Sequence, residues 1–164
     1  MADRASASIV LGGTLSHIHV DDLIAAIGAD RLCVDYGDRP LDETDIISGF
    51  SLYGAATGVA GASFDAVEAF CRDHGLHYVR RSDACPGSWD TNMVVFTGDG
   101  DVRTFASDDA GTVMLSIDEI RDLGSMSAIY NYVGPAMLDV GPLVIVGSDP
   151  PVAGGQATGG DSDG

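Results

Sequence analysis

The chain has 164 residues, of which 25 are acidic and 8 are basic, so its formal net charge is −17. Every basic residue is an arginine, and 22 of the acidic residues are aspartates. Such a surface repels phosphate groups, which argues against direct binding to nucleic acid and favours a basic protein as the partner. The alternative interpretation is that the charge only keeps the protein in solution.

Length and composition predict one folded domain in the cytoplasm. A chain of this length buries a sizeable core, and 45% of its residues are apolar. No window approaches 18 consecutive apolar residues, and the N-terminus has no apolar signal-peptide region, so neither a membrane span nor secretion is expected. The three cysteines, Cys33, Cys71 and Cys85, have no C-x-x-C spacing. We therefore expect reduced thiols that are mostly buried.

The first part of the chain predicts a strand, a helix and a second strand. Residues 1–7 are small and polar, so we expect a flexible N-terminus followed by a strand over Ser8–Leu15. A helix follows and ends at Gly28, with the spacing of one buried face at Val20, Leu23, Ile24 and Ile27. A weakly alternating run, Arg31–Asp35, predicts the second strand.

The next part repeats this order at a constant offset. Ile46–Thr57 predicts a strand, Ser63 is a suitable N-cap for a helix that Gly75 ends, and Leu76–Arg81 predicts another strand. The order β-α-β-β-α-β is that of a ferredoxin-like split β-α-β repeat. We therefore predict an α+β fold in which an antiparallel sheet carries both helices on one face.

The rest of the chain is expected to extend this sheet and cover it. Gly98-Asp-Gly100 predicts a turn that joins two strands over residues 91–106. Ser116 and Glu119 have the spacing of a capping box, so a helix begins there with Ile117 and Ile120 facing inward. The C-terminal elements are expected to be a second helix, Met126–Val133, and a strand, Leu143–Val146. The predicted domain spans residues 8–147, and residues 148–164 are expected to be a disordered tail rich in Gly, Asp and Pro.

A short histidine motif is the feature that suggests metal chemistry. Ser16-His-Ile-His-Val-Asp-Asp22 resembles the H-x-H-x-D-H zinc motif of metallo-β-lactamase-type hydrolases, with Asp22 in place of the last histidine. The motif lies too early in this chain for membership of that family. On a strand end, His17 and His19 would share one face, and Asp21 would complete a three-ligand zinc site. The alternative is that these are loop and helix-start residues.

Aspartates after residue 98 are the predicted partner-binding residues. Two pairs flank predicted turns, and two more have i, i+4 spacing on a predicted helix: Asp99, Asp101, Asp108, Asp109, Asp118 and Asp122. Carboxylates held in a row can imitate the phosphates of a nucleic acid, so a nucleic-acid mimic or inhibitor is the sharpest form of this hypothesis. The alternative is that they are solvated turn residues.

Arg80 and Arg81 form the only adjacent basic pair of the sequence, near the end of a predicted strand. Two interpretations remain open for them. The pair could bind an anion, or it could form ion pairs with nearby aspartates. Pairing with aspartate is the interpretation that we prefer.

Three classes of function follow from these observations. The first, which we prefer, is a non-catalytic acidic protein that binds a basic protein partner. The second is a ferredoxin-like module that binds a small ligand or forms an assembly subunit, for which a homo-oligomer would fit. The third is a metal-dependent enzyme that uses His17 and His19, with zinc as its cofactor. The fold alone does not choose among them.

Overall fold

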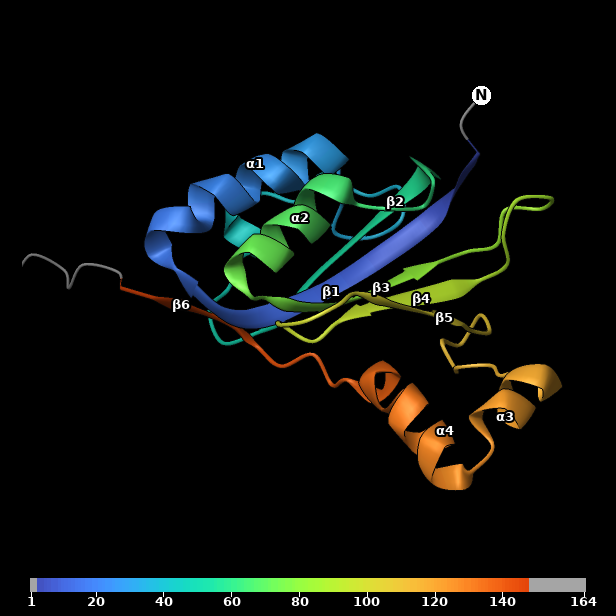
Figure 1. Cartoon of the computed structure of the whole chain (residues 1–164). Helices are drawn as coiled ribbons and strands as arrows, with labels where there is room; N and C mark the ends of the chain where they lie inside the picture. Colours follow the sequence, from blue (N-terminus) through green and yellow to red (C-terminus); the bar gives the residue numbers. More distant parts are fainter. Residues whose placement is uncertain (1–2, 148–164) are drawn as a thin grey trace, which may run out of the picture.

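The computed structural model describes residues 3–147 and shows an α+β fold built on a six-stranded sheet (Figure 1). The strands are β1 (Arg4–Ser16), β2 (Leu52–Ala60), β3 (His77–Ser82), β4 (Asn92–Phe96), β5 (Arg103–Ala106) and β6 (Leu143–Val146). The α-helices are α1 (Val20–Asp30), α2 (Asp65–His74), α3 (Ile117–Leu123) and α4 (Met126–Val133). Three short 3₁₀ turns complete the described part: η1 (His17–His19), η2 (Glu43–Asp45) and η3 (Gly134–Met137).

The strands follow the order β2-β1-β3-β4-β5, and each neighbouring pair is antiparallel. The last strand, β6, pairs in parallel with the end of β1, from Gly13 opposite Leu143 to Ser16 opposite Val146. Helices α1 and α2 lie on one face of the sheet (Figure 1). The predicted antiparallel sheet, with both helices on one face and a hairpin that extends it, is therefore confirmed.

The sheet separates two hydrophobic cores, because side chains alternate between its faces along each strand. The larger core lies under α1 and α2 and includes Ile9 and Leu11 of β1. The smaller core lies on the opposite face and is centred on Val79, Met93, Val95 and Phe105. Residues 132–140 pack against this smaller core, so the C-terminal part of the chain covers the β3–β5 side of that face.

Two predicted strands differ from the structure because local turn chemistry overrides their apolar pattern. Arg31–Asp35 is reduced to an isolated bridge at Cys33, which pairs with Ala55 of β2, before the chain turns at Gly37. The first half of Ile46–Thr57 is not a strand, because a turn lies there: the Ile47 carbonyl accepts the Phe50 N–H, and Gly49 has a φ of +96°. At the N-terminus, β1 begins at Arg4, earlier than the predicted start at Ser8.

The helix ends also depend on contacts that are distant in sequence. Helix α1 continues past Gly28 to Asp30, and Arg31 adopts the left-handed conformation that ends it. Ser63 does not cap α2, since the N-cap position is Phe64. The Asp30 carboxylate instead accepts the Val67 N–H at 2.8 Å. Burial raises the pKa of Asp30, and the hydrogen bonds from the Val67 and Ala66 N–H groups oppose this rise.

The C-terminal elements match the prediction in position but not in burial. The capping box at Ser116 and the strand Leu143–Val146 are confirmed. The prediction that Ile117 and Ile120 face inward is wrong, because both side chains are exposed. Helix α3, which carries both residues, projects away from the sheet (Figure 1).

Three further predictions concern the tail, membrane spans and the cysteines, and the structure describes residues 3–147. The predicted tail, 148–164, lies outside them. Within residues 3–147, no helix is long and apolar enough to cross a membrane. All three cysteines are free, but only Cys71 is fully buried, whereas Cys33 and Cys85 are half-buried. Burial raises the pKa of the Cys71 thiol to about 12, so this thiol stays protonated at neutral pH.

Candidate functional site

Residues 114–137, which we call the α3–α4 hairpin, form a pair of helices that projects from the sheet (Figure 1). Local sequence defines both helices. The Glu119 carboxylate accepts the Ser116 N–H at 2.7 Å, and the Glu119 N–H donates to the Ser116 hydroxyl at 3.2 Å. The first of these bonds lowers the pKa of Glu119. Gly124 ends α3 in the left-handed conformation, and the Ser125 hydroxyl caps α4 by accepting the Ala128 N–H.

The α3–α4 hairpin is anchored to the sheet at the end of α4. The Tyr132 ring meets the Phe105 ring edge-on, with 5.6 Å between the ring centroids and 76° between the planes. Val113, before the hairpin, and Leu138, after it, pack against the same core. Both ends of the hairpin are therefore fixed, while α3 and the start of α4 extend beyond the sheet.

The α3–α4 hairpin exposes an unusual amount of apolar side chain. Neither helix contains a buried residue. Six of the fourteen exposed large hydrophobic residues of the described part lie on it, and together we call them the hairpin surface: Met114, Ile117, Ile120, Met126, Tyr130 and Met137. The exposed fractions of Ile117, Met126 and Tyr130 are 75%, 62% and 64%. Single exposed apolar residues are normal, but such a concentration is typical of a binding surface.

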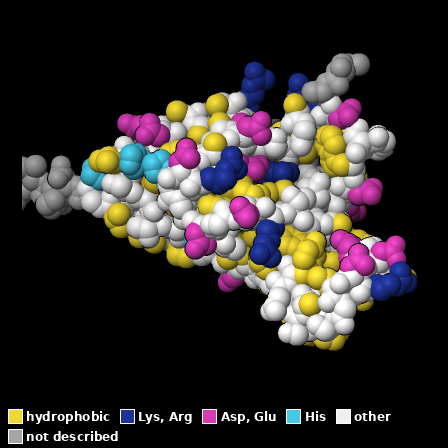
Figure 2. Space-filling view, viewed as in Figure 1, with side chains coloured by type: hydrophobic (Ala, Val, Ile, Leu, Met, Phe, Trp, Pro, Cys, Tyr) yellow, Lys and Arg dark blue, Asp and Glu magenta, His cyan; other side chains and the backbone are white. Residues whose placement is uncertain are grey.

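Acidic side chains border the hairpin surface. Helix α3 carries three exposed carboxylates, on Asp118, Glu119 and Asp122, against one basic residue, Arg121. Arg121 Nη1 lies 2.7 Å from Asp118 Oδ1, but both side chains are exposed, so this pair contributes little to stability. Figure 2 shows acidic side chains beside hydrophobic ones on the lobe that α3 and α4 form at the lower right.

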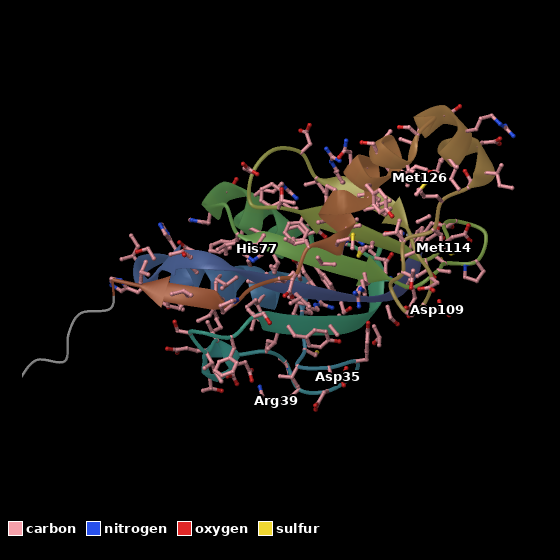
Figure 3. All side chains as sticks on the ribbon, turned by 90° about the horizontal axis from the view of Figure 1, so that it is seen from below. Asp35, Arg39, His77, Asp109, Met114 and Met126 are labelled. Carbon is pink, nitrogen blue, oxygen red and sulfur yellow. The ribbon has the colours of Figure 1, made fainter. Side chains whose placement is uncertain are left out.

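The structure divides the predicted partner-binding aspartates into two groups. Asp99 and Asp101 precede β5, whereas Asp108 and Asp109 follow it. Because a strand rises about 3.3 Å per residue, the two pairs lie roughly 20 Å apart at opposite ends of β5. In Figure 3, Asp109 lies near Met114 of the hairpin surface. Asp108 and Asp109 therefore belong with Asp118 and Asp122, and the other pair does not.

Some of these aspartates also have local structural roles. Asp108 Oδ1 accepts the Thr112 N–H at 2.7 Å, which closes the turn after β5 and lowers the pKa of Asp108. Asp109 Oδ1 accepts a hydrogen bond from the Thr91 hydroxyl at 3.3 Å. Both side chains remain exposed, so their negative charge is still presented to solvent.

The structure places the predicted zinc ligands in two different elements. His17 and His19 lie in η1 instead of alternating on a strand, and Asp21 lies in the first turn of α1. The His19 ring lies against the His74 ring, with centroids 4.4 Å apart, and its Nδ1 is 3.4 Å from Asp22 Oδ2. Among residues 3–147, no three His, Cys, Asp or Glu side chains form a cluster that could hold a metal ion.

Arg80 and Arg81 point to opposite faces of the sheet, as neighbours in a strand do. Arg80 is buried under α2, where its Nε lies 2.6 Å from Glu68 Oε1. The Nε–H is not aimed at that oxygen, so the contact is an ion pair without a hydrogen bond. The Tyr78 hydroxyl donates to Glu68 Oε2 at 3.1 Å, and burial raises the pKa of Tyr78. Arg80 therefore forms an ion pair, but with a glutamate and not with the expected aspartate.

Sequence reasoning found the acidic residues of α3 but missed the apolar ones beside them. The spacing of Ile117 and Ile120 signals an apolar helix face, and it does not distinguish a face that packs on the core from one that remains free. The hairpin surface combines apolar contact area with carboxylates, which suits binding to another protein. Comparisons of the chain with protein families, with curated proteins and with solved structures found no match.

Proposed function

We propose that the chain is a non-catalytic binding protein whose α3–α4 hairpin engages a basic protein partner. One observation carries this proposal. The two helices are anchored to the sheet at Tyr132 and bury no residue, and they expose four large apolar side chains, to which the flanking Met114 and Met137 add two more. Helices in proteins obtain most of their stability from packing an apolar face, and here that face is free.

The residue types of the hairpin surface support a protein as the occupant. Tyr130 and the three methionines belong to the residue types that are enriched at protein interfaces. Methionine side chains are flexible and polarisable, so they adapt to the shape of a partner. Tyrosine contributes a large rigid contact area, and interface hot spots are rich in it.

The charge of the chain supports a basic partner over a second copy. The formal net charge of −17 makes two copies repel each other. The carboxylates of Asp108, Asp109, Asp118 and Asp122 lie beside the apolar side chains, where they would meet basic residues at the rim of an interface. Such complementary charges speed association and exclude partners of the wrong charge.

The nucleic-acid mimic is a narrower form of this proposal. It requires carboxylates in a continuous row, and Asp99 and Asp101 lie at the far end of β5 from the hairpin. The four aspartates near the hairpin surface would therefore carry any such mimicry. The apolar side chains between them have no counterpart in a phosphate backbone, so we propose a mixed apolar and acidic interface.

We also propose that residues 4–82 follow the ferredoxin-like split β-α-β arrangement. Its support is the bridge from Cys33 to Ala55, which places the segment after α1 outside β2. With that segment counted as a short strand, the order becomes Cys33-β2-β1-β3, in which each β-α-β unit spans an inserted antiparallel strand. This scaffold serves many functions, so it does not decide between binding classes.

Affinity capture with three matched baits tests the proposed function. The baits are the full chain, a hairpin variant with Ile117→Ser and Met126→Ser, and a control variant with Ile47→Ser and Phe50→Ser. The control removes two side chains that are equally exposed but lie before β2. We expect a basic protein on the full chain and on the control, at least tenfold less of it on the hairpin variant, and its release by 0.5 M salt.

Two outcomes would contradict the proposal. One is a partner that the hairpin variant retains as well as the full chain does, which would place the interface elsewhere. The other is a partner whose binding ignores salt, because the contact of exposed opposite charges is screened within about 10 Å at 0.1 M salt. Circular dichroism of all three baits checks that each variant keeps its fold.

A further inference from the structure

A cavity of about 330 Å³ lies on the face of the sheet opposite α1 and α2. Strands β1, β2, β3 and β4 provide its floor, and the segment 136–140 provides a wall. Of the residues that line it, only Ala136 belongs to the α3–α4 hairpin and none belongs to the hairpin surface, so an occupant of the cavity would not cover that surface. Its volume is at the small end of the range of roughly 300–1,000 Å³ that ligand pockets occupy.

Strand pairing fixes the side chains of the floor in two rows. In one row, Tyr53, Val10 and Val79 are direct cross-strand neighbours. In the other row, Ser8, Arg81 and Met93 are neighbours in the same way. Directly opposite residues have Cβ atoms about 5 Å apart, so each row spans adjacent strands without a gap. The floor therefore has an apolar centre with hydroxyl groups and one cation at its margins.

The cation of the cavity is held in position. The Arg81 guanidinium packs against Gly111, where an added Cβ would lie 2.7 Å from Arg81 Cζ. Glycine suits this position because a side chain would collide with the guanidinium and because the φ of Gly111 is +80°. Among the described residues, no salt bridge to Arg81 is formed. The Arg81 side chain is exposed, and its guanidinium lies against Gly111 as a positive charge on a strongly acidic protein.

The opposite wall supplies a negative charge. Asp139 lines the same cavity, between Leu138 and Val140, and it is not within ion-pair distance of Arg81. The cavity therefore presents a cation and an anion that are not paired with each other, together with apolar side chains. The Tyr53 hydroxyl also lines the cavity and adds a donor, because a phenol is protonated at neutral pH.

We propose that this cavity binds the zwitterion of a free apolar α-amino acid of about the size of leucine. The ligand carboxylate accepts hydrogen bonds from the Arg81 guanidinium, which can bind a carboxylate with two parallel N–H groups. The ligand ammonium lies at Asp139. The apolar side chain of the ligand rests on Val10, Val79 and Met93.

Isothermal titration calorimetry of the full chain with four ligands tests this assignment. The ligands are L-leucine, L-methionine, 4-methylpentanoate, which lacks the ammonium, and 3-methylbutylamine, which lacks the carboxylate. We expect both amino acids to bind with dissociation constants below 1 mM. Each analogue should bind at least tenfold more weakly than L-leucine, because one charge of the cavity is then left without its counterpart.

Three variants locate the site. Arg81→Gln should weaken binding of L-leucine and of 4-methylpentanoate tenfold or more. Asp139→Asn should weaken binding of L-leucine but not of 4-methylpentanoate. Arg103→Gln is the matched control, because Arg103 is an exposed arginine of the same sheet outside the cavity, and it should leave both affinities unchanged.

Three results would overturn the proposal. The first is the absence of binding heat and of amide chemical-shift changes at Val10, Val79 and Met93 with 10 mM of either amino acid. The second is equal binding of 4-methylpentanoate and L-leucine, which would identify a site for simple carboxylates. The third is binding that Arg81→Gln leaves unchanged in a variant that melts like the full chain. None of these results bears on the hairpin surface, so the two proposals fail separately.

Discussion

Beneath α2 the chain buries Glu68 and Arg80 together, and this pair makes a strong residue-scale prediction. Glu68 Oε1 also accepts the Phe64 N–H at 3.1 Å, so the carboxylate serves three neighbours including Tyr78. Glu68→Ala leaves the buried guanidinium without a counterion. We expect it to lower the free energy of unfolding by about 3–5 kcal/mol.

Urea denaturation measures this loss, and a double variant separates its causes. Glu68→Leu with Arg80→Met replaces the pair by apolar side chains of similar size, which is often neutral or stabilising. We therefore expect the double variant to be clearly more stable than Glu68→Ala. A loss below about 1 kcal/mol for Glu68→Ala would show that water reaches the guanidinium and that the pair is not buried.

At the surface loop before β2, Arg39 and Asp45 make a prediction about pH. Arg39 Nη1 donates to Asp45 Oδ2 at 2.7 Å, and this bond, aided by the Asp42 N–H, lowers the pKa of Asp45 from 3.8 to about 2. The folded state therefore binds fewer protons at Asp45 than the unfolded state does. The contribution of the pair is complete above pH 4 and is lost as the pH falls through about 2.

A titration of side-chain carboxyl signals by nuclear magnetic resonance checks this value. The Asp45 signal should have its midpoint near pH 2 in the full chain. Arg39→Gln should raise the midpoint toward 3.8, because the hydrogen bond from the guanidinium, which is the largest cause of the lowered pKa, is then removed. An Asp45 midpoint near 3.8 in the full chain would mean that the loop does not hold the pair together in solution.

Among the elements, β6 depends on a glycine of β1. An added Cβ on Gly12 would lie 2.0 Å from the Gly141 carbonyl oxygen, just before β6. Gly12→Ala must therefore displace the backbone of the segment that leads into β6. We expect it to lower the free energy of unfolding by about 1–3 kcal/mol, as overpacking of a close contact does.

Gly28→Ala is the matched control for this change. Gly28 lies inside α1 and has no atom within 4 Å of its added Cβ. Alanine is the better helix former, so this variant should gain roughly 0.5–1 kcal/mol. If chemical denaturation gave both variants the same stability, the close approach of β1 and the segment before β6 would be contradicted.

Elements whose signals are local could be predicted from the sequence. The capping box at Ser116, the turn at Gly98–Gly100 and the strand Leu143–Val146 depend on a few adjacent residues, and the structure contains all three. The strand over Ile46–Ser51 could not be predicted correctly, because a turn closed by the Phe50 N–H and the Ile47 carbonyl, with Gly49 at a φ of +96°, interrupts the apolar run there. Local chemistry overrode a periodic pattern at this place.

Contacts between distant segments account for the features that the sequence did not reveal. The Asp30 carboxylate accepts a hydrogen bond from the first turn of α2, which begins 35 positions later in the chain. Arg80 of β3 forms its ion pair with Glu68 of α2. Arg81 and Asp139 line one cavity only because residues 136–140 return over the sheet. The exposure of Ile117 could not be read from helical periodicity, since the same spacing describes a face that packs on a core.

For the whole molecule, the charge predicts how copies of the chain behave toward one another. Repulsion between copies of net charge −17 should keep the protein monomeric at 50 mM salt. At 1 M salt, charges are screened within about 3 Å, so the hairpin surface should then permit weak self-association. The variant with Ile117→Ser and Met126→Ser should not self-associate at either salt concentration.

Analytical ultracentrifugation at both salt concentrations measures this behaviour. The control variant with Ile47→Ser and Phe50→Ser should behave like the full chain, because it retains the hairpin surface. A stable dimer at 50 mM salt would show that the hairpin surface binds a second copy. The occupant of the hairpin surface would then be an identical chain and not a basic protein.

Hydrogen–deuterium exchange of the complex with the captured basic protein tests the central claim most directly. The predicted result is slower exchange in α3 and α4, with unchanged exchange in the outer strand β2 at the opposite edge of the sheet. Both helices expose their apolar side chains in the free chain, and a partner that covers them would stabilise their backbone hydrogen bonds. Slower exchange in β2 or α1, with α3 and α4 unchanged, would contradict the assignment of the binding surface.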